Sequence, residues 1–462
     1  MIPNEGKRDA ASMANIPPSS PRWHWRHILL WLVLAGLVGW WRGPAFRRAF
    51  EPEFFPSGPL LFLPDFFQEW ASARNRFNGL PIYTPQEITI ERYLGLARNP
   101  ADRFFIEFNA HPPTAVLLGM PFAGLSFAGA FALWNVLSLV FLVASAALIV
   151  RQFNLPFSPW DMLPAITLLL LCYPFWHQMV HGQLNLLLLL LLTGVWAADR
   201  RGHPRWAGAL LGLATAIKLF PGFLFVYFVL RREWSAVRTG LLALAAITVL
   251  TALLLGPTSY RTYFLEVMPQ TSQWRSEWPN LSLSSLWFKL FESSRRLPPI
   301  EIQPLAHAPA LALVGVAATM IAVTAILAAV TPRLRSRRDW DLLFALTMIG
   351  MLLVSPITWD HYLLMLALPV AVVWQRWPRG GMGREAMVLL LAMLCIEARL
   401  VMEHGLILLD AAHPPNAYGN WIATPLETLT ALSLPCYALV GLFVLTLLAE
   451  GPPTVPAEQA AA

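Results

Sequence analysis

The sequence contains few charged residues for its length. Only 13% of its 462 residues are Asp, Glu, Lys or Arg, whereas 56% are hydrophobic. A soluble globular protein of this size carries about 25% charged residues, so the composition excludes an ordinary soluble domain. It indicates a protein that crosses a membrane several times, and the 20 Trp and 27 Phe residues suit long borders with lipid headgroups.

Cysteine is also scarce. The three cysteines, Cys172, Cys395 and Cys436, lie in apolar segments without the spacing of a metal site. They therefore indicate neither a disulfide framework nor a zinc site. The formal net charge of +6 is spread over loops without a lysine-rich block, which argues against nucleic-acid binding. No internal repeat is evident, and this counts against a secondary transporter.

Apolar runs predict an all-α polytopic membrane protein with about 10–12 transmembrane helices, at about 20 residues for each full span. Full-length runs lie near 128–150, 161–180, 237–256, 309–330, 386–409 and 426–448, and shorter ones at 28–42, 184–198, 341–357 and 361–376. The first run lacks a convincing cleavage site, so we interpret it as a retained anchor. We expect one transmembrane domain over 27–450, between cytoplasmic tails at 1–26 and 451–462.

The arginine-rich loops predict which side of the membrane each segment faces. Short loops at 200–205, 231–238, 333–338 and 376–384 carry several arginines each, and such loops face the cytoplasm. The outer face then receives the long loop 43–127, in which we expect interfacial helices; its residues 114–125 are too short to span and lie at the outer interface or form a re-entrant piece. It also receives the loop 257–308 and the polar turns 181–185 and 355–361.

The segment 206–230 needs separate treatment because Lys218 lies near its middle and Phe220-Pro221-Gly222 interrupts it. One straight helix would place one of its two basic flanks outside. Two half-helices that meet at Pro221 leave both flanks inside, and broken helices are tolerated where they line a cavity. We favour this hairpin over one Pro-kinked helix.

Asp65 is the first candidate for chemistry. It lies among Leu, Pro and Phe just after the first helix, and such neighbours at a membrane surface would raise the proton affinity of a carboxylate, as a general base requires. An Asp at this position also suits the N-cap of a helix over 66–76, and the two roles are compatible. His111 ends the same loop before two prolines and, taken alone, is best interpreted as an interfacial residue.

The remaining polar residues lie between apolar runs. Gly182 permits a tight turn, while Gln183 and Asn185 offer amides that suit sugar hydroxyls; the alternative is a plain turn that closes a helix end. Lys218 lies far from either flank, so it either neutralises an anion or pairs with a carboxylate. Asp360 and His361 occupy a turn that proline alone would also explain.

Several of these segments together resemble glycosyltransferase family 87, polytopic enzymes of the GT-C superfamily that use polyprenyl-phosphate sugars. The segments are Asp65-Phe66, Asn78-Gly79-Leu80-Pro81-Ile82-Tyr83, His111-Pro112-Pro113, His181-Gly182-Gln183-Leu184-Asn185, Ala207-Gly208 through Ala214-Thr215-Ala216-Ile217-Lys218-Leu219-Phe220-Pro221, Asn280-Leu281-Ser282-Leu283 and Ser355-Pro356-Ile357-Thr358-Trp359-Asp360-His361-Tyr362. They run from about residue 60 to 370 in the family's order. Phe67, where many relatives have a tyrosine-like residue, and Leu281, where Gln is frequent, depart from the pattern.

The resemblance implies a GT-C-like fold and inverting transfer of a hexose, usually mannose, from a polyprenyl phosphate to a lipid or glycan acceptor outside the plasma membrane. Asp65 matches the acidic residue that commonly serves the acceptor hydroxyl. We expect the other candidates to stabilise the departing phosphate (Lys218, His361, His181, Arg275), to orient the sugar (Gln183, Asn185, Asp360) or to contact substrate in the first loop (His111). No metal site and no cofactor besides the lipid-linked sugar is expected.

Three other functions fit the same sequence. A secondary transporter of a polar or anionic solute would suit a broken helix with a buried lysine, but not the long outer loop. A lipid-linked oligosaccharide ligase or polymerase would also place its site outside the membrane. A membrane scaffold without catalysis is the third, and transfer of labelled sugar distinguishes it from the enzymes.

Overall fold

The computed structural model describes residues 25–52, 63–96, 107–155, 158–294, 300–334, 336–377, 381–396 and 421–449. Most of these residues are helical, and two short strands, β1 (Ile300–Ile302) and β2 (Trp421–Ala423), pair in parallel. The prediction of an all-α multi-pass membrane protein is confirmed. The start of the expected domain at residue 27 lies within α1, which begins at Trp25, whereas its end at residue 450, the expected tail 451–462 and residues 1–24 lie outside the described residues.

The longest helices correspond to the predicted apolar runs. By length and composition, four described segments can cross a membrane: α6 (Phe127–Phe153), α12 (Trp234–Leu255), α16 (Pro309–Val330) with the turn after it, and α21 (Pro425–Leu429) with α22 (Leu434–Leu448). Two bent pairs raise this number to six: α1 (Trp25–Trp41) with α2 (Gly43–Phe50), bent by 62°, and α7 (Met162–Leu171) with α8 (Tyr173–His181), bent by 72°. The expected total of about 10–12 spans stays a prediction.

Shorter helices complete the fold. They are α3 (Phe66–Phe77), α4 (Gln86–Leu94), α5 (Pro113–Gly119), α9 (Asn185–Arg200), α10 (Pro204–Ile217), α11 (Phe225–Leu230), α13 (Thr258–Thr262), α14 (Met268–Thr271), α15 (Leu283–Phe291), α17 (Arg337–Val354), α18 (Ala367–Arg376) and α19 (Met382–Cys395). Helix α17 lies at the centre of the packing, since every residue from Asp341 to Val354 is buried. The predicted run 386–409 is described only as far as residue 396.

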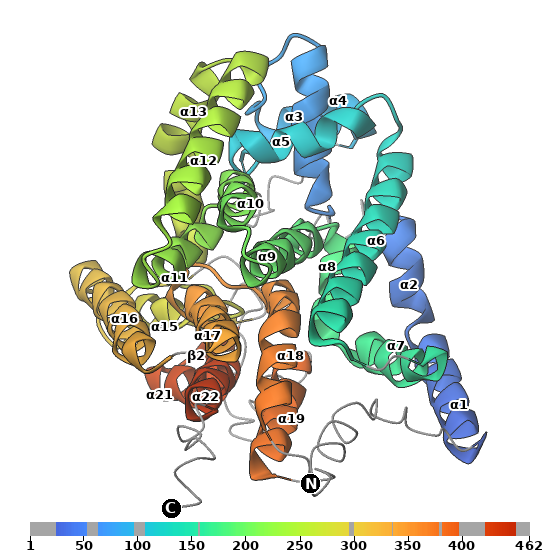
Figure 1. The fold of residues 1–462 in the computed structure, drawn as a ribbon. Helices are drawn as coiled ribbons and strands as arrows, with labels where there is room; N and C mark the ends of the chain where they lie inside the picture. The colour runs from blue at the N-terminus through green and yellow to red at the C-terminus, as the bar shows by residue number, and fades with distance from the viewer. Residues whose placement is uncertain are drawn as a thin grey trace, which may run out of the picture.

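The first outer loop folds into short helices. Helices α3, α4 and α5 lie together at the top of Figure 1. Helix α5 crosses α3 so closely that a Cβ atom at Gly119 would come within 2.4 Å of the carbonyl oxygen of Glu69. Glycine is therefore required at this crossing, and the contact fixes α3, which begins just after Asp65, against the rest of the loop.

The segment 206–230 is a broken hairpin, as the arginine pattern predicts. Helix α10 ends at Ile217, Lys218 has an extended backbone (φ −139°, ψ 138°), and a 3₁₀ turn over Phe220–Leu224 leads into α11. Arg231, at the end of α11, forms an ion pair with Asp199, which precedes α10, so both flanks lie on the same side. The break comes at Lys218, three residues earlier than the predicted break at Pro221.

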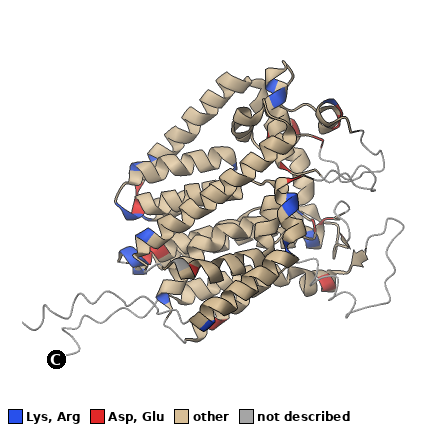
Figure 2. Ribbon diagram, turned by 90° about the vertical axis from the view of Figure 1, so that its right-hand side faces the viewer, with Lys and Arg blue, Asp and Glu red and all other residues tan. Residues whose placement is uncertain are grey.

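The polar turns and the arginine-rich loops lie at opposite ends of the same helices. Helix α9 begins at Asn185, next to the turn 181–185, and ends at Arg200. Helix α17 runs the other way, from Arg337 to Val354, where the turn 355–361 follows. Figure 2 shows that charged residues gather mainly at helix ends and that the middle parts of most helices carry none. The polar turns and the arginine-rich loops are therefore separated as expected, and which of the two ends faces the cytoplasm stays a prediction.

Candidate functional site

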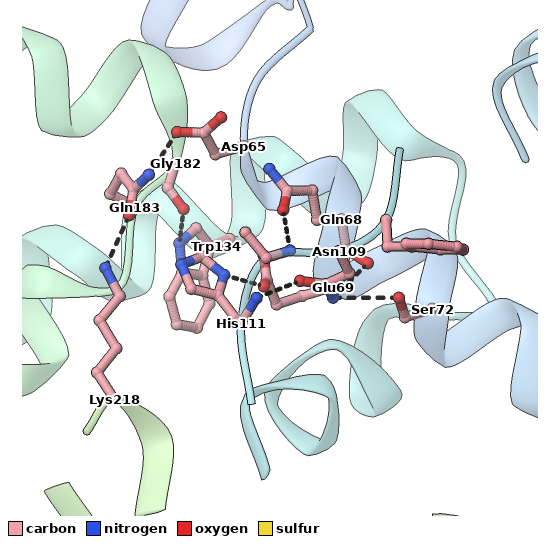
Figure 3. Close-up of polar contacts among 12 residues, drawn as sticks. Asp65, Gln68, Glu69, Ser72, Asn109, His111, Trp134, Gly182, Gln183 and Lys218 are labelled. Atoms are coloured by element: carbon pink, nitrogen blue, oxygen red, sulfur yellow. Dashed lines mark hydrogen bonds and ion pairs between the residues drawn. The ribbon is translucent and has the colours of Figure 1, made fainter. Parts of the chain in front are cut away.

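The carboxylate of Asp65 points toward the turn 181–185 (Figure 3). The backbone of Asp65 is already helical, and its side chain forms no cap hydrogen bond with α3. The proposed N-cap role is therefore wrong. Instead, Gln183 Nε2 donates to Asp65 Oδ2, and His181 Nδ1 lies 3.4 Å from the same oxygen. The Asp65 side chain is 27% exposed, so one side remains open to a substrate.

The turn that carries Gln183 is built around a glycine. Gly182 ends α8 with φ +63°, and a Cβ atom there would come within 2.8 Å of Phe66 and Phe131. Its carbonyl oxygen accepts a hydrogen bond from Trp134 Nε1 at 2.8 Å. These contacts fix the turn against α3 and α6, so the Gln183 side chain is held beside Asp65.

Lys218 joins the same cluster from the broken hairpin. Its ammonium donates to Gln183 Oε1 at 3.1 Å and to the Tyr362 hydroxyl at 3.4 Å, and it lies 4.6 Å from the centre of the Tyr362 ring. Lys218 is only 4% exposed. Because the helix stops at Ile217, the extended backbone of Lys218 directs its side chain into the interior. One Gln183 amide thus connects Asp65 with Lys218 (Figure 3).

A second polar cluster lies beside the first. His177, on α8, shares a short hydrogen bond with Asp360 through its Nδ1 atom, and the two Nδ1 atoms of His177 and His361 are 3.2 Å apart. The backbone N–H of His361 donates to Asp360 Oδ1 at 2.7 Å. His361 is 3% exposed, and its Nε2 atom has no partner among the described residues. That nitrogen is buried, and its hydrogen-bonding capacity is unused within the described residues.

His177, Asp360 and His361 could also hold a metal ion, since their ligand atoms lie within 4.8 Å of one another. Two imidazoles and one carboxylate are a common donor set for zinc. However, nitrogen and oxygen ligands bind a zinc ion at about 2.0–2.2 Å in a tetrahedral arrangement. The ligand atoms of one ion therefore cannot be hydrogen-bonded directly to one another. The direct hydrogen bond between His177 and Asp360 would have to open before an ion could enter.

The first outer loop contributes a third polar pair. His111 Nδ1 lies 2.5 Å from Glu69 Oε1, and Glu69 is 1% exposed. The His111 backbone is fixed on both sides, because its carbonyl accepts from the Tyr83 hydroxyl at 2.8 Å and its N–H donates to Asn109 Oδ1 at 2.9 Å. His111 is 13% exposed, so most of its side chain is covered by the protein.

Two predicted residues are engaged elsewhere. Asn185 is fully buried and donates to Gln178 Oε1 at 3.1 Å, so it supports the turn from behind instead of facing a sugar. Arg275 forms a two-bond ion pair with Glu292, at 2.9 and 2.6 Å, and its guanidinium stacks on Phe288 at 4.3 Å. No contact in the described residues brings Arg275 into the Asp65 cluster.

The loop of Asn280 holds the turn 355–361 in place. Asn280 Nδ2 donates to the carbonyl oxygen of Pro356 at 2.9 Å, and its Oδ1 accepts from the Thr358 backbone N–H at 2.9 Å. The Leu281 N–H donates to the Thr358 carbonyl at 2.8 Å. The segment 280–283 therefore acts on Asp360 and His361 through the backbone of their turn.

The electrostatics of Asp65 differ from the prediction. Burial alone would raise the pKa of the Asp65 carboxyl, but the charge and hydrogen bond of His181, together with His361 and Gln183, outweigh burial and hold this pKa below its usual value of 3.8. The predicted rise in proton affinity is thus wrong for the site without substrate.

The sequence did not single out His177, Glu69 or Tyr362. A local signal existed for His177, because His177 and His181 are four residues apart and share a helix face; their ring centres lie 4.2 Å apart. Tyr362 follows His361 directly, and its ring stacks on Phe220 at 5.1 Å. Glu69 lies one turn after Asp65, but only the fold brings His111 to it.

Comparison with known proteins agrees with the resemblance in the sequence. Residues 109–356 match the model of glycosyltransferase family 87. The chain is also similar to a relative from Mycobacterium tuberculosis, a polyprenol-phosphate-mannose-dependent alpha-(1-2)-phosphatidylinositol mannoside mannosyltransferase. The two sequences are 26% identical over 317 residues. The match covers 63% of this chain and 66% of the relative, just under two thirds of the relative's length. The family match includes His111, Gln183 and Lys218 but ends before Asp360. Because it spans more than half of the sequence, the chain belongs to glycosyltransferase family 87.

Proposed function

We propose that the protein transfers mannose from a polyprenyl phosphate to a hydroxyl of a lipid or glycan acceptor, at the extracytoplasmic face of the plasma membrane. The observation that carries the proposal is the chain of contacts from Asp65 through Gln183 to Lys218. These contacts place a partly exposed carboxylate and a buried cation in one cluster. The proposed reaction needs the carboxylate to accept a proton from the acceptor and the cation to stabilise the departing phosphate. The mycobacterial relative, which depends on polyprenol-phosphate-mannose, supports the choice of donor.

The reaction proposed is a single displacement. The acceptor oxygen attacks C1 of a β-linked mannosyl group and gives its proton to Asp65, while the bond from C1 to the phosphate oxygen breaks. The electron pair of that bond stays on the polyprenyl phosphate, and the product is an α-mannoside. Asp65 then releases the proton to solvent. A base positioned in this way is worth about 10²–10⁴-fold in rate.

Lys218 and His361 are assigned to the departing phosphate. The Lys218 ammonium is fixed by Gln183 and Tyr362, and His361 Nε2 has no other partner among the described residues. Donors that are fixed before the reaction stabilise developing charge without reorganisation. His177 and Asp360 hold the His361 ring and, in the arrangement proposed, no metal ion takes part.

Replacement of the proposed base tests the assignment. Asp65→Asn keeps an oxygen that accepts from Gln183, so the fold and donor binding should persist. We expect mannose transfer to fall by about 10²–10⁴-fold. Asp161→Asn is the matched control, because Asp161 accepts from the backbone of Ser158 at the start of α7. Wild-type transfer in Asp65→Asn would refute the role of Asp65.

A separate experiment tests the class of function. Membranes with radiolabelled polyprenyl-phosphate-mannose and a lipid extract should pass label to a new lipid or glycan. Movement of a whole preassembled oligosaccharide would indicate a ligase or polymerase. Solute flux across sealed vesicles without label transfer would indicate a transporter, and inactivity in both assays would indicate a scaffold.

A further inference from the structure

A polar cavity lies at the arginine-rich ends of α9 and α17. Its volume is about 370 Å³, and its walls come from the ends of α6, α9 and α18 and the start of α17. The side chains that matter for its charge are three guanidinium groups, from Arg200, Arg338 and Arg376, and one carboxylate, from Asp341. The walls of the cavity therefore carry an excess of positive charge.

The charge of Arg200 is fixed in place by its neighbours. Its NH1 atom pairs with Asp341 Oδ2 at 2.5 Å, and Asp341 Oδ1 accepts from Trp196 Nε1 at 2.7 Å. The guanidinium also lies 4.9 Å from the centre of the Phe153 ring. Asp341 is thus bound on both oxygens, and Arg200 is held rigidly at the wall.

The other two arginines leave the cavity positive. Arg376 pairs with Asp339 at 2.6 Å, but Asp339 does not line the cavity and also accepts from the Ser336 backbone N–H, where it completes the N-terminal cap of α17. Arg338 is exposed and forms no ion pair or hydrogen bond among the described residues. Among the described residues, the cavity is thus lined by one guanidinium without a carboxylate partner and two that are held by carboxylates.

This cavity is separate from the Asp65 cluster. Asn185 begins α9 at the Asp65 end, and Arg200 ends it at the cavity. At a rise of 1.5 Å per residue, the 16 residues of α9 separate the two sites by about 24 Å. A ligand of the cavity is therefore not the sugar donor in its reactive position.

We propose that the cavity binds a phosphate group, either that of a lipid headgroup or a free phosphate ion. Guanidinium groups form planar forks that match phosphate oxygens, and arginine is favoured in such sites. Basic pockets between membrane helices on the cytoplasmic side bind anionic headgroups, and the charge pattern predicts this side for the cavity. The volume accommodates a phosphate together with part of a headgroup.

Binding to the purified full-length protein tests the proposal without reference to transferase activity. The probes are inorganic phosphate, phosphatidylglycerol and, as the zwitterionic control whose headgroup carries no net charge, phosphatidylcholine, each added to detergent-solubilised protein at constant ionic strength. We expect phosphatidylglycerol, inorganic phosphate or both to raise the midpoint of thermal unfolding by several degrees, and phosphatidylcholine to have no effect. An effect of the lipid alone assigns a headgroup site, whereas an effect of inorganic phosphate assigns a site open to free anions.

Two neighbouring arginines provide a matched pair of variants. Arg338→Gln removes the free guanidinium from the cavity, whereas Arg337→Gln removes the same charge from an adjacent exposed residue that does not line it. We expect Arg338→Gln to weaken binding at least tenfold and Arg337→Gln to leave it within twofold of wild type. Absence of any anion effect on the wild type, or equal weakening in both variants, would overturn the proposal.

Discussion

Replacement of Lys218 by methionine gives the sharpest test of the site. The change keeps the length of the side chain and removes its charge. In the folded protein it removes a 3.1 Å hydrogen bond to Gln183, a 3.4 Å contact with Tyr362 and the cation near the Tyr362 ring. If Lys218 stabilises the departing phosphate, kcat should fall by about 10²–10³-fold, or about 2.7–4 kcal/mol of transition-state stabilisation.

The same change should have a small effect on folding. Burial of an ammonium costs several kcal/mol, which the apolar methionine avoids. On the other side, Gln183 Oε1 loses a donor, at a cost of about 1–3 kcal/mol. The two effects oppose each other, so we expect the unfolding midpoint of Lys218→Met to stay within a few degrees of wild type.

Lys289→Met is the matched control for this experiment. Lys289 is equally buried, at 3%, but its ammonium donates to the backbone carbonyls of Trp278 and Asn280 at 3.0 and 2.6 Å. Its loss should lower stability more than it lowers kcat of the folded protein. Purified variants in detergent, assayed with saturating polyprenyl-phosphate-mannose, separate the two effects. A kcat within threefold of wild type for Lys218→Met would show that Lys218 has no role in phosphate departure.

Further predictions concern the residues around Asp65 and Lys218. Gln183→Leu breaks the connection between them and should lower kcat by about 10²-fold, since small misplacements cost that much; unchanged kcat in a steady-state assay would contradict it. His177→Ala should lower kcat/KM about tenfold, whereas His177→Asn, which keeps a donor for Asp360, should retain more activity; equal loss would exclude a positioning role. Chelation with EDTA should leave transfer unchanged, and inactivation reversed by added zinc would instead establish a metal at His177, Asp360 and His361. Because the pKa of Asp65 lies below 3.8 in the free site, kcat/KM should show no acid limb from Asp65 between pH 8 and 5, and the stability that its carboxylate contributes should be lost only as pH falls below 3.8.

The sequence predicted the fold where the signal is local. The apolar runs near 128–150, 237–256 and 309–330 correspond to α6, α12 and α16, because length and composition alone decide whether a segment can span. The hairpin at 206–230 was predicted from a different local signal, the arginines at both its ends. The position of the break was missed by three residues, because the contacts of Lys218 with Gln183 and Tyr362 favour an end to the helix before Pro221.

The site was only partly predictable because its chemistry depends on distant segments. Gln183 and Asp65 are 118 residues apart, and His177 and Asp360 are 183 apart, so neither pair leaves a local pattern. Gln183 and Asn185 carry the same amide group in the same turn. The Gln183 side chain is directed to Asp65, whereas the Asn185 side chain is directed to Gln178. Only the turn at Gly182 decides which of the two faces the site.

The low pKa of Asp65 is compatible with its proposed role as base once the donor is considered. In the free site, His181 and Gln183 stabilise the carboxylate, and Gln183 is shared with Lys218. A donor phosphate near Lys218 and His361 brings negative charge into the same cluster. Negative charge nearby raises the pKa of a carboxylate, and competition for His181 or Gln183 would remove part of its stabilisation. Asp65 would then become a stronger base only after the donor binds, so proton removal from the acceptor would be coupled to the presence of the leaving group.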